Sequence, residues 1–194
     1  MLAVGITGGI GSGKSYICQI FEYLGIKIYY ADARARHLSN NDAGIVSQVT
    51  NLFGDKAYVN GEYNRMHIAS VVFNNSQKLQ QLNSIIHPAI EKDYHNWLKS
   101  HASEPYTLKE AAILFESGTY KLLDKTILVT APIVTRINRV VKRDNISPND
   151  VQSRINKQWP TEKILPLADF IIENDGKRLI LPQIINLDKK LKSH

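Results

Sequence analysis

The stretch that decides the fold is Gly8-Gly9-Ile10-Gly11-Ser12-Gly13-Lys14-Ser15. It fits the pattern G-x-x-x-x-G-K-[ST] at every defined position and follows an apolar run over 2–7, which predicts a strand. Apolar residues at helical spacing predict a helix over 12–24. A glycine-rich turn between a strand and a helix N-terminus lets backbone N–H groups converge on a phosphate. We therefore expect this loop to bind the phosphates of a nucleoside triphosphate.

The last two residues of the motif carry its charge and its metal ligand. Lys14 is expected to reach the β- and γ-phosphate oxygens, and the hydroxyl of Ser15 is placed to bind Mg²⁺. A chance glycine-rich turn would require four glycines, the lysine, the serine, the strand and the helix to coincide. A dinucleotide-binding fingerprint does not fit, because counting G-x-G-x-x-G from Gly9 puts Lys14 at the third glycine.

Length and composition favour one folding unit. The chain has 194 residues, of which 43% are hydrophobic, enough for one core with a smaller helical insertion. The single cysteine, Cys18, cannot form an intrachain disulfide, and we expect a small buried hydrophobe in a reducing compartment. The start lacks the features of a secretory signal, and no run approaches the roughly 18 apolar residues of a membrane helix. These features favour a soluble, cytoplasmic protein without a membrane partner.

The formal net charge is +6, so an anionic partner has to be considered. Arg136, Arg139 and Arg143 fall within about 60° of arc on one helical face, a stripe that could meet phosphate. The lysines near the C-terminus are expected at a solvated helix end. No aromatic-and-basic motif supports a nucleic-acid partner, and we expect none.

The remaining pattern alternates strands with helices. A strand is expected over 26–30, and two strands separated by one helix imply a right-handed parallel unit. Residues 33–101 are mostly helical, with a long segment over 76–101 that we expect to be interrupted at Pro88 and a strand around Tyr58. The later elements are expected as strands over 106–115, 126–130 and 168–173 and helices over 132–143, 147–158 and 178–191.

Asp32 directly follows the second strand, so in a parallel sheet it belongs to the edge that presents the phosphate loop. A carboxylate there can take a proton from an acceptor hydroxyl or help to hold Mg²⁺. It can equally be the N-cap of a helix beginning at Ala33, and the residues alone do not choose. A switch GTPase would carry an Asn-Lys-x-Asp motif, which is absent, and residues 112–116 only loosely resemble the acidic strand end of a motor or transport ATPase.

The pattern as a whole resembles the dephospho-coenzyme A kinase family. The matching positions run in order through nearly the entire chain: 5–15 with the extended Thr-Gly-Gly-Ile-Gly-Ser-Gly-Lys-Ser form, Asp32-Ala33-Arg34-Ala35-Arg36, His87-Pro88, Leu114-Phe115-Glu116, Arg139, Arg143-Asp144, Arg154-Ile155, Gln158, 168–172 and Asn174.

The resemblance implies a three-layer α/β P-loop kinase fold with a parallel five-stranded sheet in the order 2-3-1-4-5. It also implies three parts: a core of about residues 1–32, 104–131 and 160–194, a helical acceptor-binding insertion of about 33–103, and a helical lid of about 132–159. The implied activity is transfer of the γ-phosphoryl group of ATP, with Mg²⁺, to the ribose 3′-hydroxyl of dephospho-coenzyme A, the last step of coenzyme A biosynthesis. The number of subunits is left open.

The family resemblance assigns roles to single residues. Asp32 would be the general base or orienting acceptor and would hold the metal through water, while Arg139 and Arg143 would close over the triphosphate as catalytic lid arginines beside Lys14. His87 and Glu116 would bind the acceptor, although a structural histidine and a capping glutamate are the alternatives. The expected ATP contacts are Gly8, Gly9, Ile10, Gly11, Ser12, Gly13, Lys14, Ser15, Tyr16, Arg139 and, near the adenine, Asn174.

Three positions depart from the family pattern. Tyr30 replaces the first acid of the usual Asp-Ala-Asp run after the second strand, Tyr16 replaces a small hydroxyl residue, and Ala112 replaces a proline. If the first carboxylate helps to hold metal, this chain must do so differently. Two rival functions remain at this point: a kinase for another small hydroxyl substrate, and a nucleic-acid-binding ATPase module.

Overall fold

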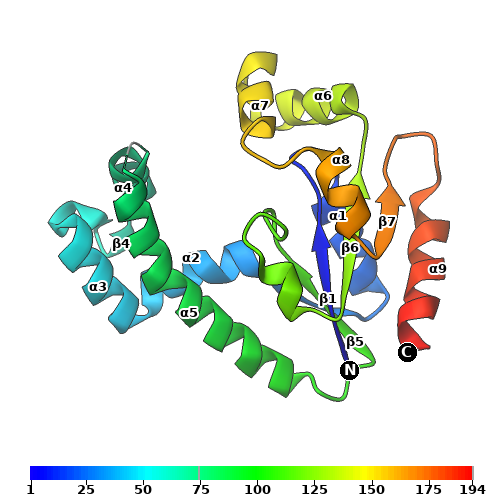
Figure 1. Cartoon of the computed structure of the whole chain (residues 1–194), viewed down its shortest axis with the longest axis horizontal. Coiled ribbons are helices and arrows are strands. Elements are labelled where there is room, and N and C mark those ends of the chain that lie inside the picture. The colour runs from blue at the N-terminus through cyan, green and yellow to red at the C-terminus, as the bar shows by residue number, and fades with distance from the viewer. Residues whose placement is uncertain (74, 194) are drawn as a thin grey trace. The chain divides into compact units, whose positions relative to one another are not determined.

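A five-stranded parallel sheet organises the larger part of the molecule (Figure 1). The structure is a computed structural model that describes residues 1–73 and 75–193. The sheet order is β2-β5-β1-β6-β7. Its strands are β1 (Leu2–Thr7), β2 (Lys27–Tyr30), β5 (Tyr106–Glu110), β6 (Lys125–Thr130) and β7 (Phe170–Glu173).

The sheet order confirms the predicted topology once the strands outside it are set aside. β3 (Tyr58–Val59) and β4 (Glu62–Tyr63) form a separate antiparallel pair. When only the parallel strands are counted, the order reads 2-3-1-4-5. β1 lies at the centre, between β5 and β6, so the loop that follows it opens at the middle of the carboxyl edge.

Two helices cover one face of the sheet. α1 (Lys14–Tyr23) contributes Ile17 and Phe21, and α9 (Ile180–Lys192) contributes Ile184, to one buried cluster with side chains of β1, β5, β6 and β7. The cluster is fully apolar at its centre, and its burial supplies the main free energy holding the helix after the phosphate loop against the sheet.

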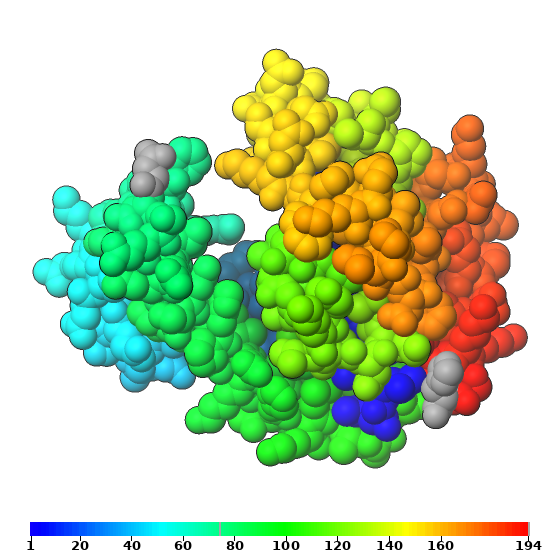
Figure 2. Space-filling model, in the orientation of Figure 1, coloured from blue at the N-terminus to red at the C-terminus, as the bar shows by residue number. Residues whose placement is uncertain are grey.

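The opposite face is covered by the chain between the strands. Phe115, Leu128 and Ile164 form a second buried cluster. Ile164 ends α8 (Thr161–Ile164), which the 3₁₀ turn η3 (Leu165–Leu167) follows. The 3₁₀ turn η2 (Thr119–Leu122) packs against the cluster through Tyr120. Figure 2 shows the orange surface of the α8 segment directly against the green surface of residues near 115–125. The two clusters make the three layers that were predicted.

Two helices follow β6, and the first of them carries the basic stripe. α6 (Ile133–Asp144) ends where Asn145 adopts φ 52°, and α7 (Pro148–Ile155) begins with Ser147, whose hydroxyl accepts a hydrogen bond of 3.2 Å from Asp150 N. α7 ends three residues earlier than predicted: Asn156 is its C-cap, and the N–H groups of Lys157 and Gln158 make tighter bonds to the carbonyl groups three residues before them. α1 likewise begins at Lys14, not at Ser12, because Gly13 lies at φ 90°.

Residues 31–100 form the second of two compact units, the first being Met1–Tyr30 with His101–His194. The second unit contains α2 (Ala31–Asn41), α3 (Ala43–Phe53), η1 (Asp55–Ala57), the β3–β4 hairpin, α4 (Arg65–Val72) and α5 (Ser76–Ser100). Ile45, Val49 and Phe53 of α3 and Leu82 of α5 form its core.

Pro88 does not interrupt the long helix of this unit. α5 runs through it without a break, so the predicted interruption is wrong. A proline inside a helix removes one backbone hydrogen bond and adds a steric conflict. Here Leu82, Ile85 and Ala89 pack into the core of the second unit on both sides of Pro88, and this burial outweighs that local cost. The strand predicted over 106–115 also ends early, at Glu110, where the chain turns away from the sheet.

A buried polar pair ties α9 to the sheet and allows a test of the core. The hydroxyl of Tyr106 donates a hydrogen bond of 2.7 Å to Asp188 Oδ1, whose other oxygen accepts 2.8 Å from Lys192 Nζ. Burial, followed by the bond to Asp188, raises the pKa of Tyr106. Tyr106→Phe is expected to lower the free energy of unfolding by about 1.5 to 3 kcal/mol, because Asp188 loses a donor in a dry environment.

Urea denaturation of the two proteins measures this change. Tyr23→Phe is the matched control, since Tyr23 is 90% exposed, and it should stay within about 0.5 kcal/mol of the parent. Equal stability of Tyr106→Phe and Tyr23→Phe would show that the buried bond adds nothing.

Candidate functional site

The phosphate loop spans the gap between β1 and α1 and depends on two glycines with positive φ. Gly11 lies at φ 79° and Gly13 at φ 90°. A Cβ added at Gly11 would stand 2.4 Å from Arg136 O, and one at Gly13 would stand 2.2 Å from Asn174 Nδ2. Neither position can carry a side chain without moving another part of the site, because both the backbone conformation and the space require glycine.

Lys14 opens α1 and is buried, with 9% of the residue exposed. Its ammonium forms an ion pair with Glu110 at the carboxyl end of β5, and about a tenth of each side chain is exposed. An ion pair at this depth needs both partners, since removing one would leave an uncompensated buried charge. The structure therefore joins the lysine of the motif to an acid on the neighbouring strand.

Two arginines of α6 contact the outside of the loop. Arg136 Nε donates 2.9 Å to Ile10 O, and Arg139 Nη1 donates to Gly11 O at 3.4 Å and Ser12 O at 3.3 Å. Burial lowers the pKa of Arg136, of which 8% is exposed, while Glu162 opposes that shift. The loop thus has two guanidinium groups against it in addition to Lys14.

Asn174 follows β7 and joins the same network. Its Nδ2 donates 2.8 Å to Ser12 O, and its Oδ1 and backbone oxygen each accept 3.1 Å from Arg139 Nη2. Asn174 is 6% exposed and is held by its own N–H, which donates 2.8 Å to Thr130 O. The structure places this predicted ATP contact directly on the phosphate loop.

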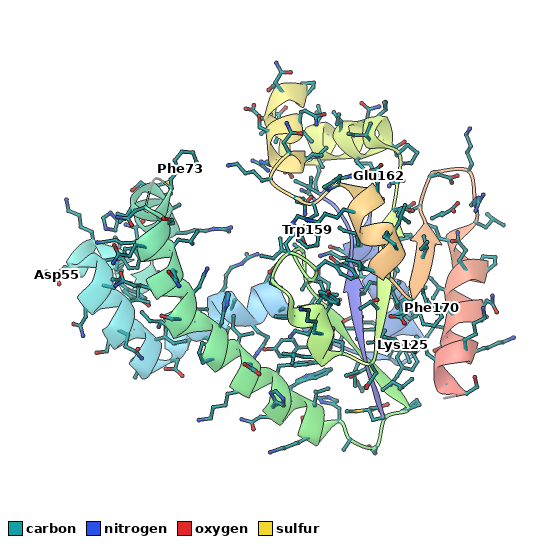
Figure 3. The ribbon with its side chains drawn as sticks, viewed as in Figure 1. Asp55, Phe73, Lys125, Trp159, Glu162 and Phe170 are labelled. Atoms are coloured by element: carbon teal, nitrogen blue, oxygen red, sulfur yellow. The ribbon has the colours of Figure 1, made fainter. Side chains whose placement is uncertain are left out.

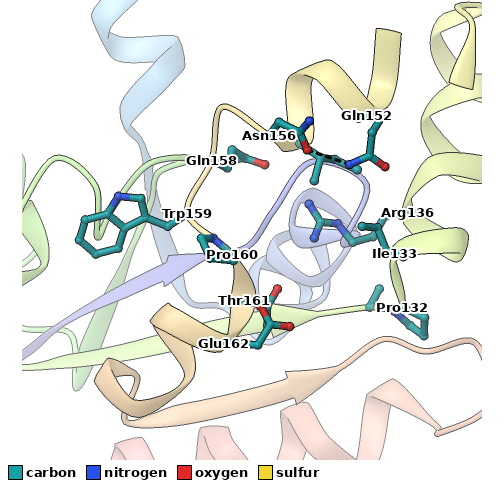
Figure 4. Close-up of a pocket in the computed structure, with 12 residues that line it drawn as sticks. Pro132, Ile133, Arg136, Gln152, Asn156, Gln158, Trp159, Pro160, Thr161 and Glu162 are labelled. Carbon is teal, nitrogen blue, oxygen red and sulfur yellow. Dashed lines mark hydrogen bonds between the residues drawn. The ribbon is translucent and has the colours of Figure 1, made fainter. Parts of the chain in front are cut away.

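A cavity of about 640 Å³ lies beside the loop, lined by residues of the 131–136 and 152–162 segments. In Figure 4 the Arg136 guanidinium points from α6 towards the loop ribbon, with Gln158 and Thr161 on the facing segment. Gln158 Oε1 accepts 2.8 Å from Ile10 N, and its Nε2 donates 3.4 Å to Ala112 O. Gln158 therefore links the phosphate loop to the segment after β5.

Glu116 lies close to this cavity, but its carboxylate is already bonded to the backbone of Trp159, one of the lining residues. Its Oε1 accepts 3.0 Å from the backbone N–H of Trp159, a residue that, with Glu162, belongs to the segment between α7 and β7 (Figure 3). The Lys163 ammonium stands 3.4 Å from the ring centroid of Trp159. This hydrogen bond joins Glu116 to a segment 43 residues further along the chain and does not cap the segment that follows it, so both the capping and the acceptor-binding roles stay predictions.

Arg143 is on the predicted stripe of α6 but is not drawn to the loop in the structure. Its guanidinium donates to both oxygens of Asp144, at 2.6 and 3.0 Å, and Arg154 adds a contact of 3.2 Å to the same carboxylate. The hydrogen bond to Arg143 lowers the pKa of Asp144. On the predicted helical face, Arg136 and Arg139 therefore contact the loop. Arg143 lies near the end of α6 and pairs with Asp144 instead.

Asp32 and His87 belong to the second unit. Asp32 lies in the first turn of α2, which begins at Ala31, so the predicted N-cap alternative is wrong: the residue is inside the helix and not before it. A carboxylate in a first turn still meets the positive end of the helix dipole. Asp32 is exposed, and His87 is exposed on α5.

Ser15 and Tyr16 follow Lys14 at the start of α1, and both are exposed; 58% of Tyr16 is accessible. Among residues 1–73 and 75–193, no three His, Cys, Asp or Glu side chains gather to hold a metal ion. Mg²⁺ does not need such a cage, because it keeps several waters and takes phosphate oxygens together with one or two protein ligands. The Ser15 hydroxyl is an oxygen donor of the required kind, so the residues fit this ion.

Sequence reasoning missed three residues of this network. Arg136 was on the basic stripe and Gln158 was among the matching positions, so both had a signal, but neither was assigned to the site. Glu110 had less signal, since it lies inside the predicted strand over 106–115 and not at the end of one. A strand end next to β1 is the feature that could have found it.

The helices within the described ranges include none long and apolar enough to cross a membrane.

Comparison with known proteins gives one family. The family model described as dephospho-CoA kinase matches residues 2–179. The dephospho-CoA kinase of Bacteroides fragilis is 34% identical over 186 residues, covering 96% of this chain and 91% of that protein. TT1252 from Thermus thermophilus has a crystal structure with a TM-score of 0.86 at 30% identity, covering 99% of this chain and 96% of the other. The dephospho-CoA kinase from Campylobacter jejuni gives a TM-score of 0.72 at 25% identity, with 98% and 97% covered.

The family match and the sequence identity over nearly the whole chain agree with the phosphate loop, the parallel sheet order and the arginines of α6. The chain belongs to the dephospho-CoA kinase family.

Proposed function

We propose that the protein transfers the γ-phosphoryl group of ATP to the ribose 3′-hydroxyl of dephospho-coenzyme A, giving coenzyme A and ADP. The observation that carries this proposal is the convergence of Lys14, Arg136 and Arg139 on a complete phosphate loop in a chain of this family. Three cations around one anion-binding loop are what a triphosphate of several negative charges requires.

The donor half of the reaction rests on the loop. Its N–H groups and the N-terminus of α1 take the β-phosphate, and Lys14 takes the β- and γ-oxygens. Ser15 holds Mg²⁺, which when bound would neutralise charge on the β- and γ-phosphate oxygens. In this proposal residues 132–159 act as a lid, and Arg139 with Arg143 neutralises charge on the transferred group. Exclusion of water by the lid would limit ATP hydrolysis.

The acceptor half rests on the second unit. In this proposal residues 33–103 bind dephospho-coenzyme A, with His87 in the acceptor site and Glu116 at its edge. Asp32, two residues beyond β2, accepts a hydrogen bond from the 3′-hydroxyl and takes its proton as the oxygen attacks phosphorus. Its place in the first turn of α2 leaves the carboxylate exposed for that contact.

A coupled assay of ADP release tests the substrate. Dephospho-coenzyme A, nucleoside monophosphates and sugar acids are compared at equal concentrations with ATP and Mg²⁺. We expect kcat/KM for dephospho-coenzyme A to exceed the others by at least about 10⁴, because a site that hydrogen-bonds one substrate leaves buried polar groups unpaired with another. A higher value for a nucleoside monophosphate or a sugar acid would replace the proposed acceptor.

Asp32→Asn tests the acceptor contact. We expect kcat to fall by about 10² to 10⁴, the usual contribution of a positioned base, while ATP affinity measured by calorimetry changes less than twofold. Asp55→Asn, a change of the same kind at an exposed aspartate of the second unit, is the control and should keep the parent rate. Near-normal turnover of Asp32→Asn would refute the assignment of the base.

The two lid arginines should differ in what they lose. Arg139→Ala removes hydrogen bonds to the loop and Asn174, so both ATP affinity and kcat should fall, kcat by about 10³. Arg143→Ala breaks an exposed pair with Asp144, which solvent screens, and among the residues that the structure describes it removes no hydrogen bond to the loop. Because the proposed function places Arg143 over the transferred group, Arg143→Ala should lower kcat. ATP affinity should stay unchanged, because the described part of the chain shows no contact of this residue with the loop.

Calorimetry and the coupled assay on both variants measure this contrast. Lys142→Ala, an exposed lysine on the same helix, is the control for loss of a positive charge. Arg143 has no part in transfer if Arg143→Ala and Lys142→Ala turn over equally fast.

A further inference from the structure

Ile10 of the phosphate loop is held by both ends of one later segment of the chain. Its carbonyl oxygen accepts 2.9 Å from Arg136 Nε, and its N–H donates 2.8 Å to Gln158 Oε1. Arg136 lies one turn into α6, and Gln158 follows the end of α7 at Ile155. The proposed function uses the charge of Arg136 but leaves Gln158 without a role.

The Arg136 end of this contact is buried and closely packed. The residue is 8% exposed, and its guanidinium lies so close to Gly9 that a Cβ added there would meet Nη2. The backbone N–H of Arg136 donates 2.9 Å to Pro132 O, two residues after β6 ends at Thr130. The start of the lid segment is therefore attached both to the loop and to the sheet.

The Gln158 end is attached to the segment after β5 by two neighbouring hydrogen bonds. Gln158 Nε2 donates 3.4 Å to Ala112 O, and the N–H of Trp159 donates 3.0 Å to Glu116 Oε1. A single amide thus uses its oxygen on the phosphate loop and its nitrogen on the core. The lid segment is attached to the core at both limits, and the two attachments meet at Ile10.

A neutral side chain suits position 158. Lys14, Arg136 and Arg139 supply positive charge around the loop for a triphosphate. A carboxylate at this place could also accept the N–H of Ile10, but its charge would offset a guanidinium and repel the phosphates. It would also lack a donor for the core carbonyl. An amide meets both requirements without reducing the positive charge.

The cavity of about 640 Å³ beside the loop gives these contacts a second consequence. Arg136 and Gln158 both line it, and both reach Ile10 from it (Figure 4). A cavity of this size with polar side chains in its lining has room for water. While the two side chains hold Ile10, they stand between the cavity and the loop backbone at that residue.

We propose that Gln158 is a positioning residue for phosphoryl transfer: together with Arg136 it fixes both ends of the lid to Ile10, so that the lid arginines keep their place over the triphosphate. This inference rests on the proposed function. Transfer to a hydroxyl needs aligned reacting atoms, and a displacement of about 1 Å can lower a rate about 100-fold. Hydrolysis needs less, because water can reach the γ-phosphorus wherever the lid does not exclude it.

The partition of ATP between transfer and hydrolysis tests the proposal. At saturating ATP and dephospho-coenzyme A with Mg²⁺, coenzyme A is measured by chromatography and inorganic phosphate by a phosphate-binding reporter. In hydrolysis the oxygen of water attacks the γ-phosphorus, the bond to ADP breaks and phosphate is released. In Gln158→Met, which keeps the length but not the hydrogen bonds, we expect kcat for coenzyme A to fall roughly 10- to 100-fold. Hydrolysis should not fall, so phosphate released per coenzyme A should rise by the same factor.

Gln152→Met is the matched control. Gln152 lines the same cavity, but its Nε2 donates 2.9 Å to Asn156 Oδ1, and within the described residues it makes no hydrogen bond to the loop. This variant should keep the kcat and the partition of the parent. Urea denaturation measures what each variant loses in stability. A role of Gln158 in the fold alone would lower the stability of Gln158→Met and leave its partition at the parent value.

A double-mutant cycle tests whether Ile10 is the shared point of attachment. Arg136→Met alone should also raise the phosphate released per coenzyme A. If both side chains act through Ile10, the double variant should partition little worse than the worse single variant, because members of one hydrogen-bond network are not additive. Effects that multiply would show that the two side chains act separately, and the proposed attachment of both lid ends to Ile10 would be wrong.

The outcomes separate this inference from the proposed function. If the parent protein forms no coenzyme A, the proposed function fails, and this inference fails with it. If the parent forms coenzyme A and Gln158→Met keeps the parent partition, the role of Gln158 alone is refuted. Should Gln158→Met fail to fold by circular dichroism, Gln158→Asn keeps the amide but shortens its reach. Its partition should then shift in the same direction, and an unchanged value would refute the proposal.

Discussion

The rest of the site depends on the carbonyl oxygens of the phosphate loop. A loop that turns its N–H groups inward, towards phosphate, turns its carbonyl groups outward, and these need donors of their own. In this structure the donors come from elsewhere in the chain: Arg136 serves Ile10, and Arg139 and Asn174 serve Ser12. Each donor is placed by a sheet strand or by the helix after one, so the loop conformation is a property of the whole sheet edge.

This constraint also explains why the glycines are where they are. Gly13 has no room for a Cβ, because Asn174 Nδ2 would lie 2.2 Å away. A Cβ added at Gly9 would lie 2.2 Å from Nη2 of the Arg136 guanidinium. The motif is usually explained by the approach of phosphate to the backbone. Here the outer side of the loop imposes a second requirement, since guanidinium and amide groups must come equally close.

The fold could be predicted well because its signals are local or belong to one edge. The apolar run over 2–7, the complete loop motif and the strand at 26–30 each depend on a few neighbouring residues, and the parallel order followed from the resemblance. Pro88 was misjudged because the packing of Leu82 and Ala89, which keeps α5 continuous, is made by residues far away in the sequence. Local rules give the cost of a proline but not the burial that offsets it.

The site was less predictable, because its partners are decided by tertiary structure. A helical wheel places Arg136, Arg139 and Arg143 on one face, but only the turn of the chain at Asn145 and the presence of Asp144 explain why the last of them points elsewhere. Glu110 depends on strand register, which a single sequence does not give.

The hydrogen bonds of Asn174 and Gln158 to the loop have a consequence for the order in which the protein is made. The loop is synthesised before the groups that hold its backbone, because those groups all lie beyond residue 135. A growing chain therefore carries the motif without the side chains that fix its shape until residues 136, 158 and 174 have been made. Bound nucleotide can stabilise the complete site only after β7 has joined the sheet. A chain that stops before residue 174 has the motif without Asn174, which holds the loop.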